Sequence, residues 1–334
     1  MNKFLILALS ASAAIATSSC GAKSSSTAAE ETGETSEIAV ANDTATVYFI
    51  KDITPENIQK VYEALGRKAE GKVAVKLSTG EPGNDYHLDP KLIAPLVQQL
   101  NGTIVENNTA YNGGRDLTAD HLKAAADHGF TAIAPVVIMD AEGQDTLVVN
   151  GGKHLKENYV GQAWKDYDFT VVLSHFKGHP MAGFGGAMKN ISIGMASSKG
   201  KCWIHSAGQY TDKAQTWSNV PADSVFQESM AEASKSVIDA AGDKILYINV
   251  ANNLSVDCDC VATPEAPQMG DLGIFASLDP VAVDQACVDA VRQSSDHGKI
   301  HLIERMDSKS GPWNLEYAEQ IGAGTRKYKL VTLE

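Results

Sequence analysis

The sequence predicts an α/β fold in which a largely parallel sheet is flanked by helices. Short apolar runs of strand length alternate along the chain with longer amphipathic segments of helix length. Helix-start signals, in which Thr or Asp precedes Pro, recur between these runs. Polar loops follow several of the apolar runs. From residue 46 onward, the chain has the length of one large domain or of two intimate lobes.

The elements of the first half follow from local patterns. β-Branched and apolar residues bounded by turn residues predict strands at 46–50, 72–77, 103–106, 134–139 and 146–149. Helices are expected to begin at Thr54-Pro55 and at Asp89-Pro90. The first residue of each pair can accept hydrogen bonds from free N–H groups, and proline fits the first turn. A third helix is expected from Leu117 to His128, with Gly129 at its end.

The second half continues the same alternation. Apolar runs predict strands at 169–173, 244–250, 273–276 and 328–333. A long helix is expected from Val225 to Ala241, closed by Gly242. Another helix is expected to run from Asp279-Pro280 to about Arg292, by the capping argument used above.

The first 20 residues have the pattern of a lipoprotein signal peptide. Lys3 supplies a positive charge, an apolar segment at 4–15 is too short to cross a bilayer, and small residues precede Cys20. Thr17 stands where lipoprotein signals usually have Leu, and an ordinary secretory signal cleaved nearby is the alternative. We expect Cys20 to carry lipid. The lipid would anchor the protein outside the cytoplasm, on the periplasmic or outer-membrane face of a bacterial membrane.

Composition limits the partners of the mature chain. Residues 21–45 are rich in Ser, Thr, Ala and Glu, a composition that predicts a flexible tether. The α/β domain is expected to follow it at 46–334. A formal net charge of −13 argues against binding to nucleic acid or to an anionic membrane surface. No later segment is apolar enough to cross a bilayer, so the N-terminal lipid should be the only membrane contact.

The most informative stretch is Ser174–Asn190, a glycine-rich segment that follows an apolar strand. Its histidines, His175 and His179, can ligate a metal or move protons, and its lysines, Lys177 and Lys189, can hold an anion. Gly183, Gly185 and Gly186 would let the backbone approach a ligand and expose N–H groups to an anion. The alternative is a sharp turn with solvated polar side chains.

A second cluster is Asp257-Cys258-Asp259-Cys260. Cys258 and Cys260 could ligate a soft or borderline metal, or supply two ligands to an iron–sulfur cluster. A local disulfide and two free thiols are the alternatives.

Two further polar loops follow predicted strands, one from Lys76 to Asn84 and one from Asn107 to Arg115. Loops at the carboxyl ends of parallel strands build the ligand sites of α/β folds, and Arg115 could clamp a carboxylate or phosphate. By the same rule, His175 or His179 should lie within reach of the Cys258/Cys260 pair. Solvated turns are the alternative for both loops. His121 and His128 are expected on the surface of their helix.

Five stretches of the chain carry a further resemblance: 76–84, 174–190, 257–260, 271–284 and 321–328. Together they resemble the family called domain of unknown function three hundred and sixty-two, whose members are often labelled iron–sulfur-centre proteins. The resemblance implies an α/β fold and no settled reaction. Many members carry a ferredoxin-like insert, but the corresponding interval here, Lys199 to Asp223, contains only Cys202. Ferredoxin-type 4Fe–4S clusters are therefore not expected.

A shorter run, from Gly178-His179 to Lys189, is similar to a motif of nickel-pincer lactate racemases. That similarity implies that Lys189 anchors a pyridinium cofactor and that His175 or His179 acts as acid or base.

These observations lead to two functional hypotheses. The first is a metal- or cofactor-dependent enzyme that performs redox chemistry or proton transfer on a small anionic substrate. The second is a non-catalytic surface lipoprotein that binds a metal or small ligand. In the first, His175, Lys177, His179 and Lys189 are the catalytic candidates, and Cys258 and Cys260 would hold a metal. The candidate cofactor-binding residues are Lys76, Asn84, Arg115, Gly183, Gly185, Gly186 and Asn190.

Overall fold

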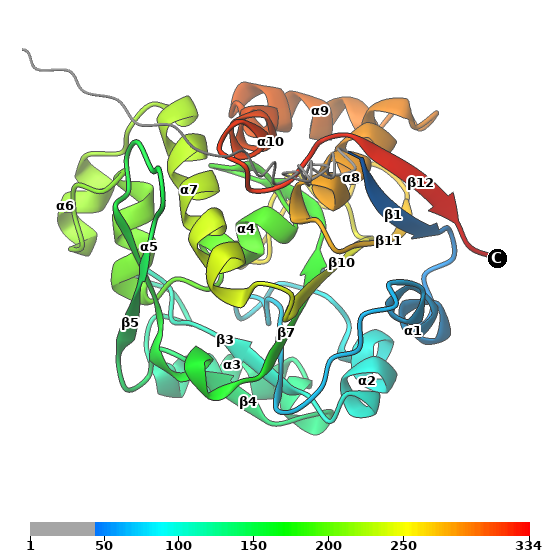
Figure 1. The fold of residues 1–334 in the computed structure, drawn as a ribbon, viewed down its shortest axis with the longest axis horizontal. Coiled ribbons are helices and arrows are strands. Elements are labelled where there is room, and N and C mark those ends of the chain that lie inside the picture. The colour runs from blue at the N-terminus through cyan, green and yellow to red at the C-terminus, as the bar shows by residue number, and fades with distance from the viewer. Residues whose placement is uncertain (1–43) are drawn as a thin grey trace, which may run out of the picture. The chain divides into compact units, whose positions relative to one another are not determined.

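An eight-stranded sheet in the order β12-β1-β11-β10-β7-β2-β3-β4 forms the centre of the protein (Figure 1). The computed structural model describes residues 44–334. The strands of this sheet are β1 (Ala45–Ile50), β2 (Val73–Lys76), β3 (Thr103–Glu106), β4 (Val136–Ile138), β7 (Phe169–His175), β10 (Ile245–Ala251), β11 (Gly273–Ser277) and β12 (Tyr328–Thr332). The prediction of an α/β fold with a largely parallel sheet is confirmed.

The strands in the middle of the sheet are parallel, whereas the side that contains β11 is mixed. From β4 to β10 all neighbouring strands are parallel, whereas β11 runs antiparallel to both β10 and β1. The segment between β10 and β11 contains no helix. A parallel return normally needs a crossover of a dozen or more residues, usually through a helix, and β11 instead returns in the opposite direction.

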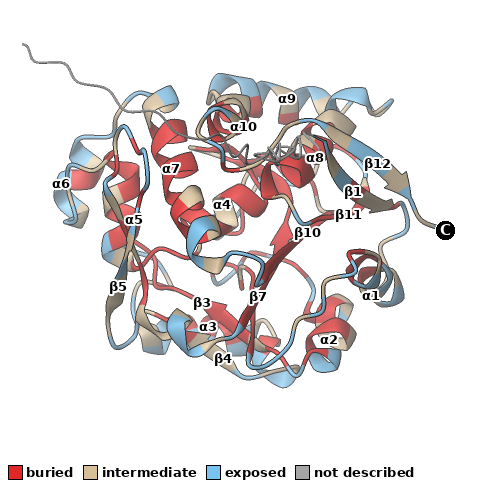
Figure 2. Ribbon diagram, viewed as in Figure 1, coloured by how far each residue is buried: buried red, intermediate tan, exposed pale blue. Residues whose placement is uncertain are grey.

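Helices cover both faces of the sheet. On one face lie α1 (Pro55–Ala64), α2 (Pro90–Gln99) and α3 (Thr118–Asp127), which share an apolar core with the sheet. On the other face α4 (Ala187–Ser192) and α8 (Pro280–Gln293) contact the strands. Behind them pack α7 (Asp223–Ala241), α9 (Lys299–Ser308) and α10 (Gly311–Gln320). Figure 2 shows the buried central strands between these layers, and exposed residues along α9.

The predicted helix starts are confirmed by their caps. The Thr54 side chain accepts a hydrogen bond from the Asn57 N–H at 3.2 Å, and Asp89 accepts one from Lys91 at 2.9 Å. Asp279 accepts from the first turn of α8, at 2.8 and 3.0 Å. α1, α2 and α8 each begin at the proline of the expected pair, because short-range capping chemistry decides these positions.

Several short elements were not predicted. They are β6 (Glu157–Gly161), β8 (Lys177–His179), β9 (Gly183–Gly185), α5 (Ser198–His205), α6 (Lys213–Ser218) and 3₁₀ turns at Phe130–Ala132 and Gln162–Asp166, together with the longer helices α9 and α10. The strand expected at 146–149 is β5 (Gln144–Val148), which belongs to a separate β5–β6 hairpin rather than to the main sheet. This hairpin contacts α5 and α7, which together enclose a third apolar cluster.

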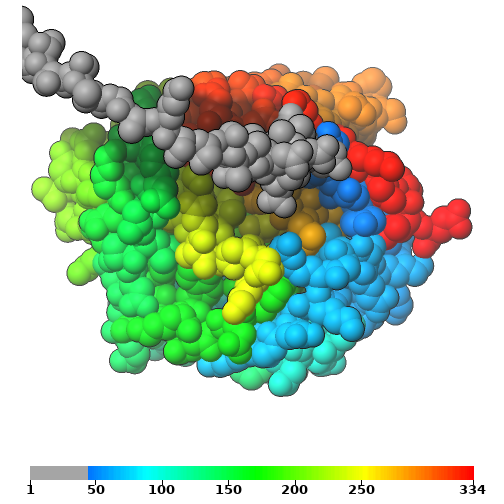
Figure 3. All heavy atoms as spheres, in the orientation of Figure 1, coloured from blue at the N-terminus to red at the C-terminus, as the bar shows by residue number. Residues whose placement is uncertain are grey.

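The two ends of the described chain meet at one edge of the sheet. β1 and β12 pair in parallel there and lie side by side, blue beside red, in Figures 1 and 3. Among residues 44–334, no helix is long and apolar enough to span a membrane. The expected signal peptide and Cys20 lie outside the described residues.

The expectation that His121 lies on the surface is wrong. Its side chain is fully buried on α3, with Nε2 3.5 Å from a carboxylate oxygen of Glu106. The flanking Ala and Lys residues suggested exposure, but α3 turns this position toward the end of β3.

Candidate functional site

A cavity of about 280 Å³ lies at the carboxyl ends of β2, β3 and β7. In the sheet, β3 and β4 continue to one side of β2, and β7 and β10 lie on the other, so the chain reverses its winding here. α/β folds bind ligands at such switch points, because the loops after neighbouring strands diverge and leave a crevice.

Most of the predicted site residues line this cavity: Lys76, Arg115, His175, Lys177, His179, Gly185, Gly186, Lys189, Asn190, Cys258 and Cys260. Asn84 and Gly183 do not. The Asn84 side chain donates to the carbonyls of Cys258 and Val261, at 3.3 and 2.7 Å, and so supports the cysteine loop. Gly183, at φ 79°, packs against the backbone of Met306 and Gly311.

The first group of lining residues surrounds Glu106, at the end of β3. Lys76 Nζ lies 3.5 Å from one carboxylate oxygen, and Arg115 donates to the other at 3.2 Å. Arg115 also donates to Glu81 at 3.1 Å. The nearby cations, Lys76 foremost, hold the pKa of Glu106 well below its usual range against the effect of burial. This carboxylate therefore stays ionised and fixes two cationic side chains at the cavity wall.

The second group surrounds Asp259, which the sequence reasoning did not select. Its carboxylate accepts from Lys177 Nζ at 2.6 Å and lies 2.8 Å from His175 Nδ1. Despite burial, Lys177 and His175 lower the pKa of Asp259. His175 Nε2 also faces an acceptor, the Asn252 carbonyl, at 2.7 Å. Both ring nitrogens of His175 are engaged, so this histidine positions the loop and offers no free nitrogen to a ligand.

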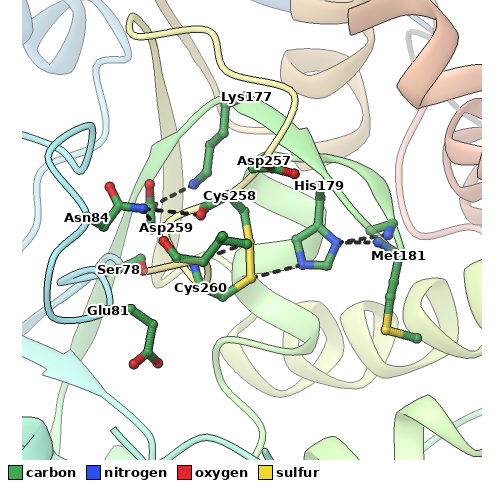
Figure 4. The surroundings of a disulfide bond; sticks show 12 residues. Ser78, Glu81, Asn84, Lys177, His179, Met181, Asp257, Cys258, Asp259 and Cys260 are labelled. Atoms are coloured by element: carbon green, nitrogen blue, oxygen red, sulfur yellow. Dashed lines mark hydrogen bonds and ion pairs between the residues drawn. A yellow bond between two sulfur atoms is a disulfide. The ribbon is translucent and has the colours of Figure 1, made fainter. Parts of the chain in front are cut away.

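The third group contains His179. Its Nδ1 accepts hydrogen bonds from the backbone N–H groups of Met181 and Ala182, at 3.1 and 2.9 Å. Nδ1 therefore carries no proton, and the hydrogen of the neutral ring is on Nε2. Burial and the charge of Lys189 keep the pKa of His179 well below its usual range. Nε2 lies 3.6 Å from Cys260 Sγ (Figure 4).

Cys258 and Cys260 form a disulfide in this structure. The expected convergence of the histidine and cysteine loops is confirmed by the His179–Cys260 contact. In the disulfide form, however, the pair cannot supply the thiolate ligands that the sequence suggested for a metal. His179, Cys258 and Cys260 are close enough for one ion, but Nε2 of the neutral ring carries a hydrogen and has no lone pair to offer.

Gly186 has a different role from the one expected. The first N–H groups of α4, at Ala187 and Met188, donate to the buried carboxylate of Asp284 on α8, at 2.7 and 2.9 Å. They are thus unavailable to an anion in the cavity. A Cβ at Gly186 would lie 2.3 Å from Asp284, so this glycine is required for α4 to pack against α8.

Lys201 and His205 are two further polar residues of the cavity wall that the sequence pattern did not single out, as is the case for Glu106 and Asp259. Lys201 and His205 both lie on α5, one turn apart, and the spacing of four residues was the signal that could have found them. His205 Nδ1 donates to the Lys201 carbonyl at 2.7 Å, which leaves the Nε2 lone pair free. Burial lowers the pKa of His205 to about 4 and that of Lys201 to about 8.

Lys189 differs from the other cations of the cavity. Lys76, Arg115, Lys177 and Lys201 each donate to protein oxygens. Within residues 44–334, Lys189 has no hydrogen-bond acceptor. Burial and the neighbouring charge of Lys177 lower its pKa to about 7, from an ordinary value of 10.5.

The charge of the wall is positive. Of the side chains that the structure describes, five cationic ones line the cavity, against the two carboxylates of Glu106 and Asp259. This excess lies within a chain whose net charge is −13. A small anion would find both opposite charge and an unsatisfied donor here.

The family described as Domain of unknown function (DUF362) matches residues 73–289. No curated protein matches the sequence. The lactate racemase apoprotein from Thermoanaerobacterium thermosaccharolyticum is similar in structure, with a TM-score of 0.45 and 14% sequence identity over 75% of this chain. A protein from Thermotoga maritima has a TM-score of 0.36 and 12% identity over 80% of this chain. The chain spans 58% of the length of each of these two.

Proposed function

The chain belongs to the DUF362 family, and we propose that it is an enzyme that binds a small organic anion and transfers a proton to or from it. The observation that carries this proposal is Lys189. It is a cationic side chain without an acceptor among residues 44–334, it lies on the wall of a cavity with excess positive charge, and its pKa is about 7. A group that titrates near neutral pH can both give and take a proton, which is the property required of an acid–base catalyst.

The roles of the other groups follow from their hydrogen bonds. Arg115 and Lys201 are fixed at the wall and would hold a carboxylate or phosphate. His205 presents a free Nε2 lone pair and would accept a hydrogen bond from a hydroxyl of the substrate. Lys189 would then exchange a proton with the bound anion.

The similarity to nickel-pincer lactate racemases suggests a pyridinium cofactor anchored on Lys189, with histidine as metal ligand or acid–base group. The free amine of Lys189 is compatible with such an anchor. His175 and His179 do not fit the ligand role, because both nitrogens of the first are engaged and Nε2 of the second carries hydrogen. The proposed reaction therefore uses no metal held by these two histidines.

Deuterium incorporation tests the proposal across many candidate substrates at once. The protein is incubated in D₂O with a panel of small carboxylates and organic phosphates, and loss of C–H signals is followed by proton NMR. We expect exchange at a carbon next to the anionic group of at least one compound. Lys189→Met should abolish this exchange, whereas the exposed-site control Lys91→Met should retain it.

Two outcomes would contradict enzymatic proton transfer in different ways. Saturable anion binding in calorimetry without deuterium incorporation would favour the non-catalytic binding protein. If no anion of the panel binds, both anion binding and proton transfer at this cavity would be contradicted.

For its location, we propose a lipid-anchored protein outside the cytoplasm, on the basis of the N-terminal sequence pattern. Cys20→Ser should move the protein from the membrane fraction to the soluble fraction, because the lipid is attached to this sulfur. Membrane association that is unchanged in Cys20→Ser would contradict lipid anchoring at this residue.

A further inference from the structure

We propose that the Cys258–Cys260 disulfide is a thiol–disulfide exchange site, and that it reacts with small thiols bearing a carboxylate or a similar anionic group. The exchange chemistry is argued from the two cysteines and their contacts. The preference for an anionic thiol rests on the proposed anion-binding function of the same cavity. The two parts are therefore tested by different measurements.

Both sulfur-bearing residues line the cavity, but they are unequally accessible. Cys258 is 3% exposed, whereas Cys260 is half-buried. Thiol–disulfide exchange requires the incoming thiolate to reach one sulfur of the bond. Cys260 is therefore the sulfur that an incoming thiol reaches first.

The disulfide contributes little to holding the chain together. The two cysteines are separated by only two positions, and the stabilisation by a disulfide grows with the logarithm of the length of the loop that it closes in the unfolded chain. The surrounding loop has other attachments: Glu81 N–H donates to the Asp259 carbonyl at 2.7 Å, and Gly178 N–H donates to Ser255 at 2.8 Å. The bond can thus open while the loop stays in place.

Each sulfur already faces a hydrogen-bond donor that would stabilise a thiolate. The Cys260 backbone N–H lies 3.2 Å from Cys258 Sγ. Nε2–H of His179 lies 3.6 Å from Cys260 Sγ, as Figure 4 shows, and the backbone bonds to Nδ1 keep that hydrogen on Nε2. Donors to sulfur favour the thiolate over the thiol and so favour exchange.

The reaction balances as two successive thiol attacks. The thiolate of the first substrate attacks Cys260 Sγ, the bond to Cys258 breaks, and its electron pair stays on Cys258, which takes a proton from solvent. A second substrate thiolate attacks the substrate sulfur of the mixed disulfide and releases Cys260 as a thiolate facing His179. Two thiols are oxidised to one disulfide, and the protein disulfide is reduced to a dithiol.

The experiment measures reduction of the folded, oxidised protein by 3-mercaptopropionate and by 2-mercaptoethanol at equal thiolate concentration, with alkylation and mass spectrometry after acid quenching. We expect the carboxylate-bearing thiol to react at least about tenfold faster. Lys189→Met should reduce this advantage. Cys202→Ser, which removes a buried cysteine of α5 outside the cavity, is the control and should react like the unaltered protein.

Single-cysteine variants identify the reacting sulfur. With the disulfide of 3-mercaptopropionate, Cys258→Ser should form a mixed disulfide at Cys260 at least about tenfold faster than Cys260→Ser forms one at Cys258. In the Cys258→Ser background, His179→Phe should move the pH profile of Cys260 alkylation to higher pH, because the donor to the thiolate is removed. Circular dichroism verifies that each variant is folded.

The possible failures are distinguishable. A disulfide that resists excess thiol until the protein is unfolded, or equal reactivity of the two single-cysteine variants, would overturn the exchange site. Exchange at Cys260 without any preference for the carboxylate-bearing thiol would leave the exchange site standing and would contradict the anion-binding cavity. Binding of a thiol-free carboxylate by a protein whose disulfide is inert would leave only the anion-binding cavity.

Discussion

At the scale of single residues, the cavity combines fixed charges with one charge that can change. Glu106 and Asp259 remain ionised because cations surround them, and they fix those cations in turn. Lys189 has no such partner among residues 44–334, so its charge responds to pH and to the contents of the cavity. This difference makes Lys189 and Glu106 the most informative positions for substitution.

Anion binding should weaken as pH rises through about 7, because Lys189 loses its proton there. Above that pH, we expect the Kd of a bound carboxylate to rise by up to about tenfold per pH unit for one linked proton. Isothermal titration calorimetry between pH 6 and 8.5, about one unit or more on either side of this pKa, measures the slope. In Lys189→Met the slope around pH 7 should be lost, which leaves only the contribution of Lys201 near pH 8, and the affinity should fall by at least about tenfold.

The same residue should lower stability at neutral pH. The pKa of Lys189 in the folded state, about 7, lies below its value in the unfolded chain. The unfolded chain therefore binds more protons between the two values, and stability should rise with pH across that window. Lys189→Met should raise the thermal midpoint at pH 6, and it should remove the part of the rise of stability with pH that Lys189 causes. A lower midpoint in that variant would contradict the account of an unpaired lysine.

Glu106→Gln should destabilise the protein by about 3–5 kcal/mol, because it leaves the buried charges of Lys76 and Arg115 without their shared carboxylate. Urea unfolding at pH 7 measures the loss, with the exposed-site variant Glu142→Gln as control. Since the folded-state pKa of Glu106 is depressed, its contribution should be complete above the unfolded pKa and should disappear as the solution is acidified. Equal stability of both variants would contradict this role.

At the scale of secondary-structure elements, α4 depends on a partner far away in the sequence. It is a short helix, and its first two N–H groups are capped by Asp284 of α8 rather than by a neighbouring residue. Asn249 of β10 donates to the same carboxylate at 2.7 Å. Because Lys189 and Asn190 project from α4 to the cavity, α8 indirectly positions part of the site.

Asp284→Asn should destabilise the fold by about 1–3 kcal/mol, since one amide oxygen cannot satisfy all the donors that now share the carboxylate. Burial raises the pKa of Asp284 to about 6, so the folded state binds more protons than the unfolded chain between about 4 and 6. The stability of the unaltered protein relative to Asp284→Asn should therefore fall as pH rises across that range. Unfolding of both proteins from pH 4 to 7 checks the sign, with the exposed-site variant Asp243→Asn as control.

At the scale of the whole molecule, an acidic protein surrounds a positively charged cavity. This contrast favours small anions that fit inside over polyanions that would also meet the acidic surface. The described cysteines also differ in location. Cys202 and Cys287 are buried in separate helices, whereas Cys258 and Cys260 face the cavity.

Protein purified without oxygen should contain no ferredoxin-type cluster, because each such cluster needs four suitably placed thiolates. Iron analysis and electron paramagnetic resonance measure this. A [4Fe–4S] signal with about four irons per chain would contradict the prediction. Zinc-loaded protein would instead argue for a metal at the cysteine pair in its reduced form.

The fold class, the approximate positions of the main-sheet strands and of helices α1, α2, α3, α7 and α8, and the segments that meet at the carboxyl edge of the sheet could all be predicted from the amino-acid sequence. These depend on local periodicity, on caps such as Thr54 and Asp279, and on the rule that parallel strands share their carboxyl edge. Packing in three dimensions was needed to establish which histidine nitrogens carry hydrogen or are engaged, that Asp259 pairs with His175 and Lys177, and that Asp284 caps α4. It also placed Lys201 and His205 in the wall. The physical reason is that protonation, pairing and burial depend on atoms brought together by packing from distant parts of the chain, and no local pattern contains that information.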